Sequence, residues 1–222
     1  ENSALWPDLP HNRYETFFLK MTKNDFRLKV EGVGKFRVYK GKYISWEREN
    51  SSTRDQDLRT FLLGSAIGAL LIQRGILVFH GNALIKNKNC ILCIGHSGHG
   101  KSTLAYSLIQ NGWELLADDL VANSQEMEVL PGIPTIKLWE DSAKAFNIDI
   151  QNLNQIRQGV NKYIYHPEKN KNSFSTSQKL KTIYLLRESH KVSKKASDSF
   201  EIIPINSQQR ATLILRNHCY RP

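Results

Sequence analysis

Residues 90–119, CILCIGHSGHGKSTLAYSLIQNGWELLADD, decide the fold. Residues 90–94 form a short apolar run that predicts a buried strand. The run leads directly into residues 95–102, which match the pattern G-x-x-x-x-G-K-[S/T] at every fixed position. Residues 103–109 then predict a helix, closed by Asn111-Gly112. A strand, a glycine-rich loop and a helix in this order are typical of a phosphate-binding P-loop, and they predict an α/β fold.

Each part of this loop suits a nucleoside triphosphate. The glycines let successive main-chain N–H groups point at phosphate oxygens, and the helix N-terminus adds positive potential. Lys101 would reach the β and γ phosphates, and the Ser102 hydroxyl would ligate Mg²⁺. We therefore expect ATP and Mg²⁺ as cofactors. The expected nucleotide-binding residues are Gly95, His96, Ser97, Gly98, His99, Gly100, Lys101, Ser102 and Thr103.

Two adjacent carboxylates follow the loop closely. Asp118 and Asp119 come at the end of a predicted strand over residues 113–117, and Asp118 lies only 17 residues after Lys101. One helix and one tight turn would therefore return the chain to the γ phosphate. There one carboxylate could hold the metal, and the other could take a proton from an attacking hydroxyl.

The segment before the loop predicts two short strands, over residues 76–79 and 83–85, joined by His80-Gly81-Asn82. His80 ends the first of these strands. A lone histidine in such a place is usually structural, but strand pairing would bring this one close to the loop.

The remaining chain divides into two parts. Residues 1–50 predict a small β module, and residues 55–222 the P-loop catalytic domain. Alternating apolar residues predict a meander of strands in the module, over residues 26–30, 36–39 and 43–46.

Further elements are expected in the second part. Helical spacing predicts a buried helix over residues 58–73, with Asp55 or Asp57 as its N-cap and Gly75 as its end. The other expected elements are a short helix near 141–146, strands over 181–186 and 200–205, and a last helix over 208–216 capped by Ser207.

The composition excludes several classes of protein. In 222 residues, 40% are hydrophobic, which is enough to bury a core and excludes general disorder. The longest mostly apolar run has twelve residues, over 61–72. A membrane-spanning helix needs roughly 20. Three cysteines are too few for a disulfide framework, so we expect a soluble, cytoplasmic protein. The first residue is Glu1, and whether residues precede it is open.

The net charge of +10 is unevenly spread. Residues 157–195 contain ten Lys and Arg residues and only two acidic ones. Such a surface suits an acidic or phosphorylated peptide, although a solvated face would have the same composition. Nucleic acid is disfavoured as a partner because no regular aromatic residues alternate with the lysines.

The run from His80-Gly81 through the loop to Asp118-Asp119 resembles the catalytic core of HPr kinase/phosphorylase. Residues 61–119, together with Leu130-Pro131-Gly132 and Lys137-Leu138-Trp139, more closely resemble the HPr-kinase-related proteins, which include lasso-peptide kinases that phosphorylate a serine. The resemblance covers residues 55–220. It implies the P-loop fold shared with phosphoenolpyruvate carboxykinase, a mixed sheet with flanking helices, here preceded by the β module.

The resemblance also implies roles. Asp118 becomes the general base, Asp119 a metal ligand or the partner of His80, and His80 the electrostatic support of both aspartates. HPr enzymes are hexamers, so a homo-oligomer is one expectation for the assembly. Thr103 stands where HPr kinases carry a glutamate, which argues against phosphorylase activity and against HPr as the substrate.

Other candidates have weaker signals. Lys137 follows a Pro-rich bend and could meet the nucleotide or the substrate, while Arg187 and Arg210 could neutralise transferred charge. Cys90 and Cys93 have CxxC spacing, but alternation in one strand sends them to opposite faces, which favours a structural role.

These observations favour an enzyme, an Mg-ATP-dependent kinase acting on a serine-type hydroxyl of a peptide or small protein, such as a natural-product precursor peptide. Two alternatives remain open. One is a kinase for a sugar or a free amino acid, and the other is a nucleotide-dependent switch that phosphorylates nothing.

Overall fold

The computed structural model describes residues 17–167, 176–187 and 201–221. In this part of the chain, groups of strands are separated by helices, and the largest sheet contains parallel and antiparallel pairs, so the fold is mixed α/β. None of the helices within these ranges is both long enough and apolar enough to cross a membrane.

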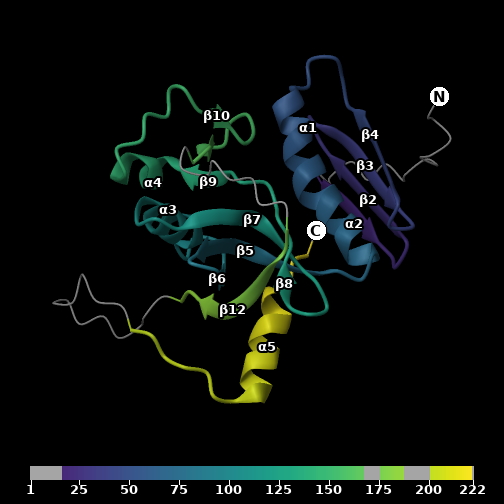
Figure 1. Ribbon diagram of the computed structural model, residues 1–222. Coiled ribbons are helices and arrows are strands. Elements are labelled where there is room, and N and C mark those ends of the chain that lie inside the picture. The colour runs from purple at the N-terminus through teal and green to yellow at the C-terminus, as the bar shows by residue number, and fades with distance from the viewer. Residues whose placement is uncertain (1–16, 168–175, 188–200, 222) are drawn as a thin grey trace.

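The strands that flank the glycine-rich loop form one mixed sheet (Figure 1). β5 (Leu77–Lys86) pairs antiparallel with β6 (Asn89–Ile94) on one side and with β7 (Glu114–Asn123) on the other. β12 (Gln178–Leu185) runs parallel to β6. The short β8 (Glu128–Val129) pairs with both β7 and β12, so the sheet closes on itself in the order β12-β6-β5-β7-β8.

Alternate side chains of β6 enter two different cores. Cys93 packs with α3 (Lys101–Gln110), whereas Cys90 packs in the cluster that also receives α5 (Gln208–His218). The expected division of the two cysteines between opposite faces is therefore confirmed. Burial raises the thiol pKa to about 11 for Cys90 and about 12 for Cys93, as suits structural residues.

The N-terminal strands form a separate four-stranded meander, β1 (Phe17–Met21), β2 (Asp25–Val30), β3 (Gly34–Tyr39) and β4 (Tyr43–Arg48). The three predicted strands are present, and β1 is additional. Alternation in β2 and β3 places one row of side chains in a core, as the pattern indicates.

That core is closed by a helix made of α1 (Asp55–Phe61), a π-helical segment η2 (Leu62–Ala66) and α2 (Ile67–Gln73). The N-cap prediction is wrong. Arg54 is the N-cap, no side chain caps the helix, and Asp57 instead forms an ion pair with Arg54 at 2.8 Å. The helix ends before Gly75, as predicted, because Gly75 adopts φ +75°. The division into two domains stays a prediction.

A small third sheet stands beside α3. It contains β10 (Asn154–Gln155), β11 (Lys162–Tyr165) and β9 (Ile136–Trp139), and α4 (Glu140–Ala145) follows β9 directly. Ile136 and Leu138 of β9 are buried in the same core as α3, which ties this sheet to the glycine-rich loop.

Two strand predictions next to the candidate site are wrong. The expected pair over 76–79 and 83–85 is the single strand β5, which runs through His80-Gly81-Asn82. The strand expected to stop before Asp118 continues as β7 to Asn123. Both run on because β5 is hydrogen-bonded along both edges, and Gly81 permits the close approach: a Cβ there would lie 2.3 Å from the Cys93 carbonyl oxygen.

The C-terminal predictions have mixed outcomes. Residues 201–206 have no regular structure, so the strand expected over 200–205 is wrong, and Phe200 itself lies outside the described residues. The last helix is α5, and the Ser207 side chain accepts a hydrogen bond from the Arg210 N–H, so this N-cap is confirmed.

Gly81→Ala should destabilise the fold, because its Cβ would meet main-chain atoms that cannot move without parting β5 from β6. We expect a loss of about 1–3 kcal/mol in the free energy of unfolding, measured by urea titration. Gly64→Ala is the matched control, since nothing lies within 4 Å of a Cβ at that helical position. Equal unfolding midpoints for the two variants would contradict the close approach.

Candidate nucleotide and phosphoryl-transfer site

The glycine-rich loop joins the end of β6 to the start of α3, in the strand–loop–helix order that its motif requires. Gly98 and Gly100 adopt φ +86° and +78°, a left-handed region that favours glycine. Gly95 lies against the residue that follows β12, and a Cβ there would lie 2.8 Å from the Leu186 carbonyl oxygen. The backbone geometry therefore explains all three glycines.

Lys101 begins α3 with a buried side chain. Its Nζ donates to the carbonyl oxygens of Gly95 and His96, both at 2.9 Å. Burial lowers its pKa, although the nearby Asp119 charge opposes this effect. The loop thus surrounds a cation at the N-terminus of a helix, where a phosphate group is favoured. The Thr103 hydroxyl lies 3.2 Å from the Ser142 hydroxyl, so Thr103 contacts α4.

The two aspartates lie within β7, opposite β5. Asp118 pairs in register with Asn82, whose Nδ2 donates to the Asp118 carboxylate. The Lys137 main-chain N–H donates to the other oxygen of Asp118 at 3.2 Å, and the Lys137 ammonium forms an ion pair with Asp119. Neighbouring side chains of a regular strand point to opposite faces. Both carboxylates reach Lys137 here because Asp119 adopts φ +62°, which turns the chain locally.

Their surroundings shift the pKa values of the two carboxyl groups in opposite directions. Burial and the neighbouring Asp119 charge raise the pKa of Asp118 to about 8. Burial also disfavours the charged form of Asp119, but the ammonium groups of Lys137 and Lys162 outweigh it and hold the Asp119 pKa below its ordinary value. At neutral pH the pair therefore shares one negative charge, carried by Asp119.

His80 stands next to this pair on β5. Its ring is hydrogen-bonded to the Asp119 main chain, and its residue neighbour Gly81 lies opposite Asp119 in the register. Burial lowers the His80 pKa, so the ring is mainly neutral at pH 7. The Tyr220 ring packs 6.5 Å from it, held by a hydrogen bond of 2.7 Å from the Tyr220 N–H to Val78.

The site contains three residues that the sequence did not single out as site residues, Asn82, Lys162 and Tyr220. Asn82 could have been found, because it follows His80-Gly81 on the same strand and two-residue alternation places it on the same face as His80. Lys162 and Tyr220 come from distant parts of the chain, and no local pattern marks them. Lys137, a lesser candidate in the sequence, contacts both aspartates.

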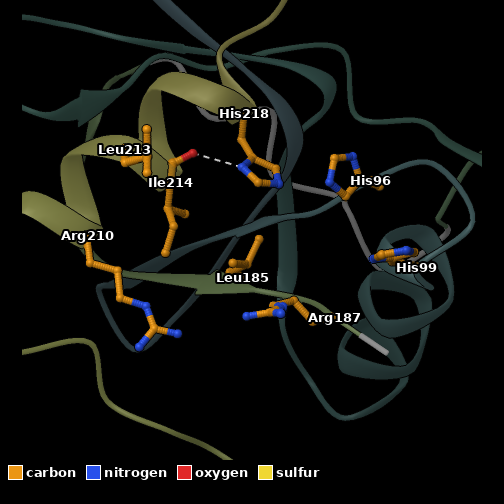
Figure 2. Close-up of a pocket in the computed structure, with 8 residues that line it drawn as sticks. All are labelled: His96, His99, Leu185, Arg187, Arg210, Leu213, Ile214 and His218. Atoms are coloured by element: carbon orange, nitrogen blue, oxygen red, sulfur yellow. Dashed lines mark hydrogen bonds between the residues drawn. The ribbon is translucent and has the colours of Figure 1, made fainter. Parts of the chain in front are cut away.

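Arg187 and Arg210 lie elsewhere. Together with His96 and His99 they line a hollow of about 500 Å³ between the loop, the end of β12 and α5 (Figure 2). The arginines therefore lie with β12 and α5, and neither is among the contacts that the structure gives for the two carboxylates.

The donor set beside the loop suits Mg²⁺. This ion prefers one or two carboxylates together with hydroxyl and phosphate oxygens, so it needs no dedicated protein cage. Ser102 and Asp119 supply such oxygens, and the Oδ1 of Asn82 is buried without a partner among the described residues. In the described part of the chain, no cluster of three or more His, Cys, Asp or Glu side chains could hold a metal by itself.

The basic stretch is described only in part. Arg157, Lys162, Lys179, Lys181 and Arg187 lie within the described residues. The other five, Lys169, Lys171, Lys191, Lys194 and Lys195, lie outside them.

Comparison with known proteins gave matches among solved structures alone. No family model and no curated protein matches the chain. Among solved structures, the Hpr(Ser) kinase/phosphatase from Coxiella burnetii is similar, with 21% sequence identity and a TM-score of 0.33 over 64% of this chain and 89% of that chain. Function therefore has to be inferred from the site's own geometry.

The raised pKa of Asp118 makes a prediction about stability. Because the folded chain binds this proton more tightly than the unfolded chain, Asp118 costs the fold stability as pH rises from 3.8 to about 8. Asp118→Asn cannot ionise, so the difference between its melting temperature and that of the unmodified chain should rise with pH from 3.8 to about 8. Asp141→Asn, which removes an exposed carboxyl group of α4, is the control for the substitution itself. A flat difference for Asp118→Asn would refute the raised pKa.

Proposed function

We propose that the chain is an Mg-ATP-dependent kinase that transfers the γ phosphate to a serine-type hydroxyl of a peptide or small protein. The observation that carries the proposal is the pair Asp118 and Asp119 beside a complete phosphate-binding loop, with pKa values driven apart. When two neighbouring carboxyl groups have such different pKa values, one can serve in acid–base chemistry while the other, which stays ionised, holds a cation.

Asp118 is the group suited to accept a proton. A general base works best when its pKa lies near the working pH, and a value of about 8 meets that condition. Asn82 and the Lys137 N–H each hold one oxygen of the carboxyl group, which fixes its direction. In the proposed reaction, the ionised form of Asp118, whose population grows as the pH approaches 8, takes the proton of the acceptor hydroxyl while the hydroxyl oxygen attacks the γ phosphorus and ADP leaves.

Asp119 and its neighbours would help to neutralise the negative charge of the phosphates. Asp119 stays ionised, so with the Ser102 hydroxyl it could hold Mg²⁺, which when bound neutralises the β and γ phosphates. Lys101 would bind the same phosphates from the loop. His80, neutral and bonded to the Asp119 main chain, would position that carboxylate. Catalysis would then depend mainly on orientation and charge neutralisation.

The basic residues support an acidic acceptor. Lys162 is close enough to influence the pKa of His80, Lys101 and both aspartates, so positive charge extends from β11 into the site. A peptide with acidic residues around its acceptor serine would be attracted to this surface.

The test is transfer from γ-labelled ATP with Mg²⁺ into a size-fractionated lysate of the source cell. We expect acid-stable label in a peptide or protein fraction, which mass spectrometry then assigns to a serine. Asp118→Asn should keep ATP affinity and lose about 10²–10⁴-fold in transfer, because the loop is intact and only the base is gone.

Lys101→Ala should instead lose ATP affinity itself, and Asp141→Asn should transfer normally. Label in small molecules would favour the sugar or amino acid kinase, and label only in free phosphate would favour the switch. Full transfer by Asp118→Asn would show that Asp118 is not the general base.

A further inference from the structure

A hollow lies beside the glycine-rich loop, on the side where β12 ends. It is bounded by the loop, the end of β12 and α5, as Figure 2 shows. Its volume of about 500 Å³ is in the range of pockets that hold small ligands. Its lining residues are His96, His99, Leu185, Arg187, Arg210, Leu213, Ile214 and His218.

The order of the strands shows where the hollow lies relative to the loop. β6 leads into the loop and has β5 on one side, with β7 and the aspartates beyond it, and β12 on the other side. A triphosphate whose γ phosphate lies by Asp118 and Asp119 can extend across the loop toward β12. The nucleoside end of the nucleotide then faces the hollow.

The chemistry of the lining suits a nucleoside better than an anion alone. The His218 Nδ1 donates to the Ile214 carbonyl oxygen at 2.8 Å, because a carbonyl can only accept. In the neutral ring this leaves Nε2 as an acceptor, and it is buried with no partner among the described residues. A ribose hydroxyl or an exocyclic amino group could donate to it, whereas a phosphate oxygen could not.

The other side chains complete such a site. Leu213 is 58% exposed although it lines the hollow, so it offers apolar surface to a base. The His96 ring, 5.2 Å from that of His218, offers an aromatic face beside the loop. Arg187 and Arg210 have no acidic partner in the described ranges and could bond to the ribose or the α phosphate.

We propose that this hollow binds the nucleoside of ATP, with Leu213 against the base and His218 Nε2 accepting a hydrogen bond. This proposal rests on the proposed function only in taking ATP as the nucleotide. It extends the nucleotide site from the loop to α5.

The experiment compares two probes by calorimetry, ATP and inorganic tripolyphosphate, each at fixed Mg²⁺. The unmodified chain should bind ATP more tightly than tripolyphosphate. His218→Phe, which keeps an aromatic ring but loses the acceptor, and Leu213→Ser should each weaken ATP binding about tenfold. Neither should change tripolyphosphate binding by more than about twofold, because the loop is untouched.

Leu63→Ser is the matched control, a leucine that is 43% exposed on η2, outside the hollow. It should bind both probes as the unmodified chain does, and melting curves show which variants are folded. Equal weakening of both probes by the hollow variants would make the hollow an anion site, and no weakening would leave it out of the nucleotide site. Either result overturns the proposal while the loop still binds tripolyphosphate.

If the unmodified chain binds neither probe, the proposed function fails together with this proposal. If ATP binding depends on the hollow but no acceptor is ever labelled, the kinase assignment fails and the nucleoside site remains.

Discussion

The register of β5 between β6 and β7 is the constraint on which the candidate site depends. In that register Gly81 lies opposite both Ile94, the last residue of β6 before the loop, and Asp119, while Asn82 lies opposite Asp118. Adjacent strands are about 4.8 Å apart, and β5 alone separates β7 from β6, so the carboxylates lie two strand spacings from the strand that leads into the glycine-rich loop. A slip of one residue would turn Asn82 and His80 to the other face. The glycine is needed because a side chain at 81 would strike the Cys93 carbonyl.

The electrostatics of the site follow from that placement. Lys101, Lys137 and Lys162 all lie near enough to interact electrostatically with the two aspartates, and at neutral pH the pair carries about one negative charge. Three cations thus face a single anion before a nucleotide arrives. Such an excess favours a phosphate group, and it lets one carboxyl group keep its proton while the other stays ionised. Lys137 contacts Asp118 through its main-chain N–H and Asp119 through its ammonium group, so the fold itself makes the two carboxyl groups differ.

Local patterns in the sequence predicted some of this arrangement and missed the rest for physical reasons. The alternation of residues 90–94, the glycine pattern of the loop and the Ser207 cap depend on neighbouring residues, so they were predicted correctly. The continuity of β5 through His80-Gly81-Asn82 depends on two partner strands, and a Gly-Asn pair resembles a turn when those partners are unknown. The left-handed Asp119 and its contact with Lys137 depend on β9, which comes 17 residues later. Tyr220 lies near the end of the sequence, and its contribution depends on a hydrogen bond from its main-chain N–H to the distant Val78 carbonyl oxygen.

That distant contact joins the two ends of the proposed nucleotide site. Cys219 pairs with Phe79 of β5 in an isolated antiparallel β-bridge, and the side chains of the residues before and after Cys219 point to different parts of the site. His218 packs against His96 of the loop at 5.2 Å, whereas Tyr220 packs against His80 at 6.5 Å. The end of α5 therefore lies beside the hollow, and the residue after the bridge lies beside the aspartates. Since the same three residues touch both ends, docking of the C-terminal segment and completion of the site are one structural event, and a nucleotide that fills the site should stabilise that docking.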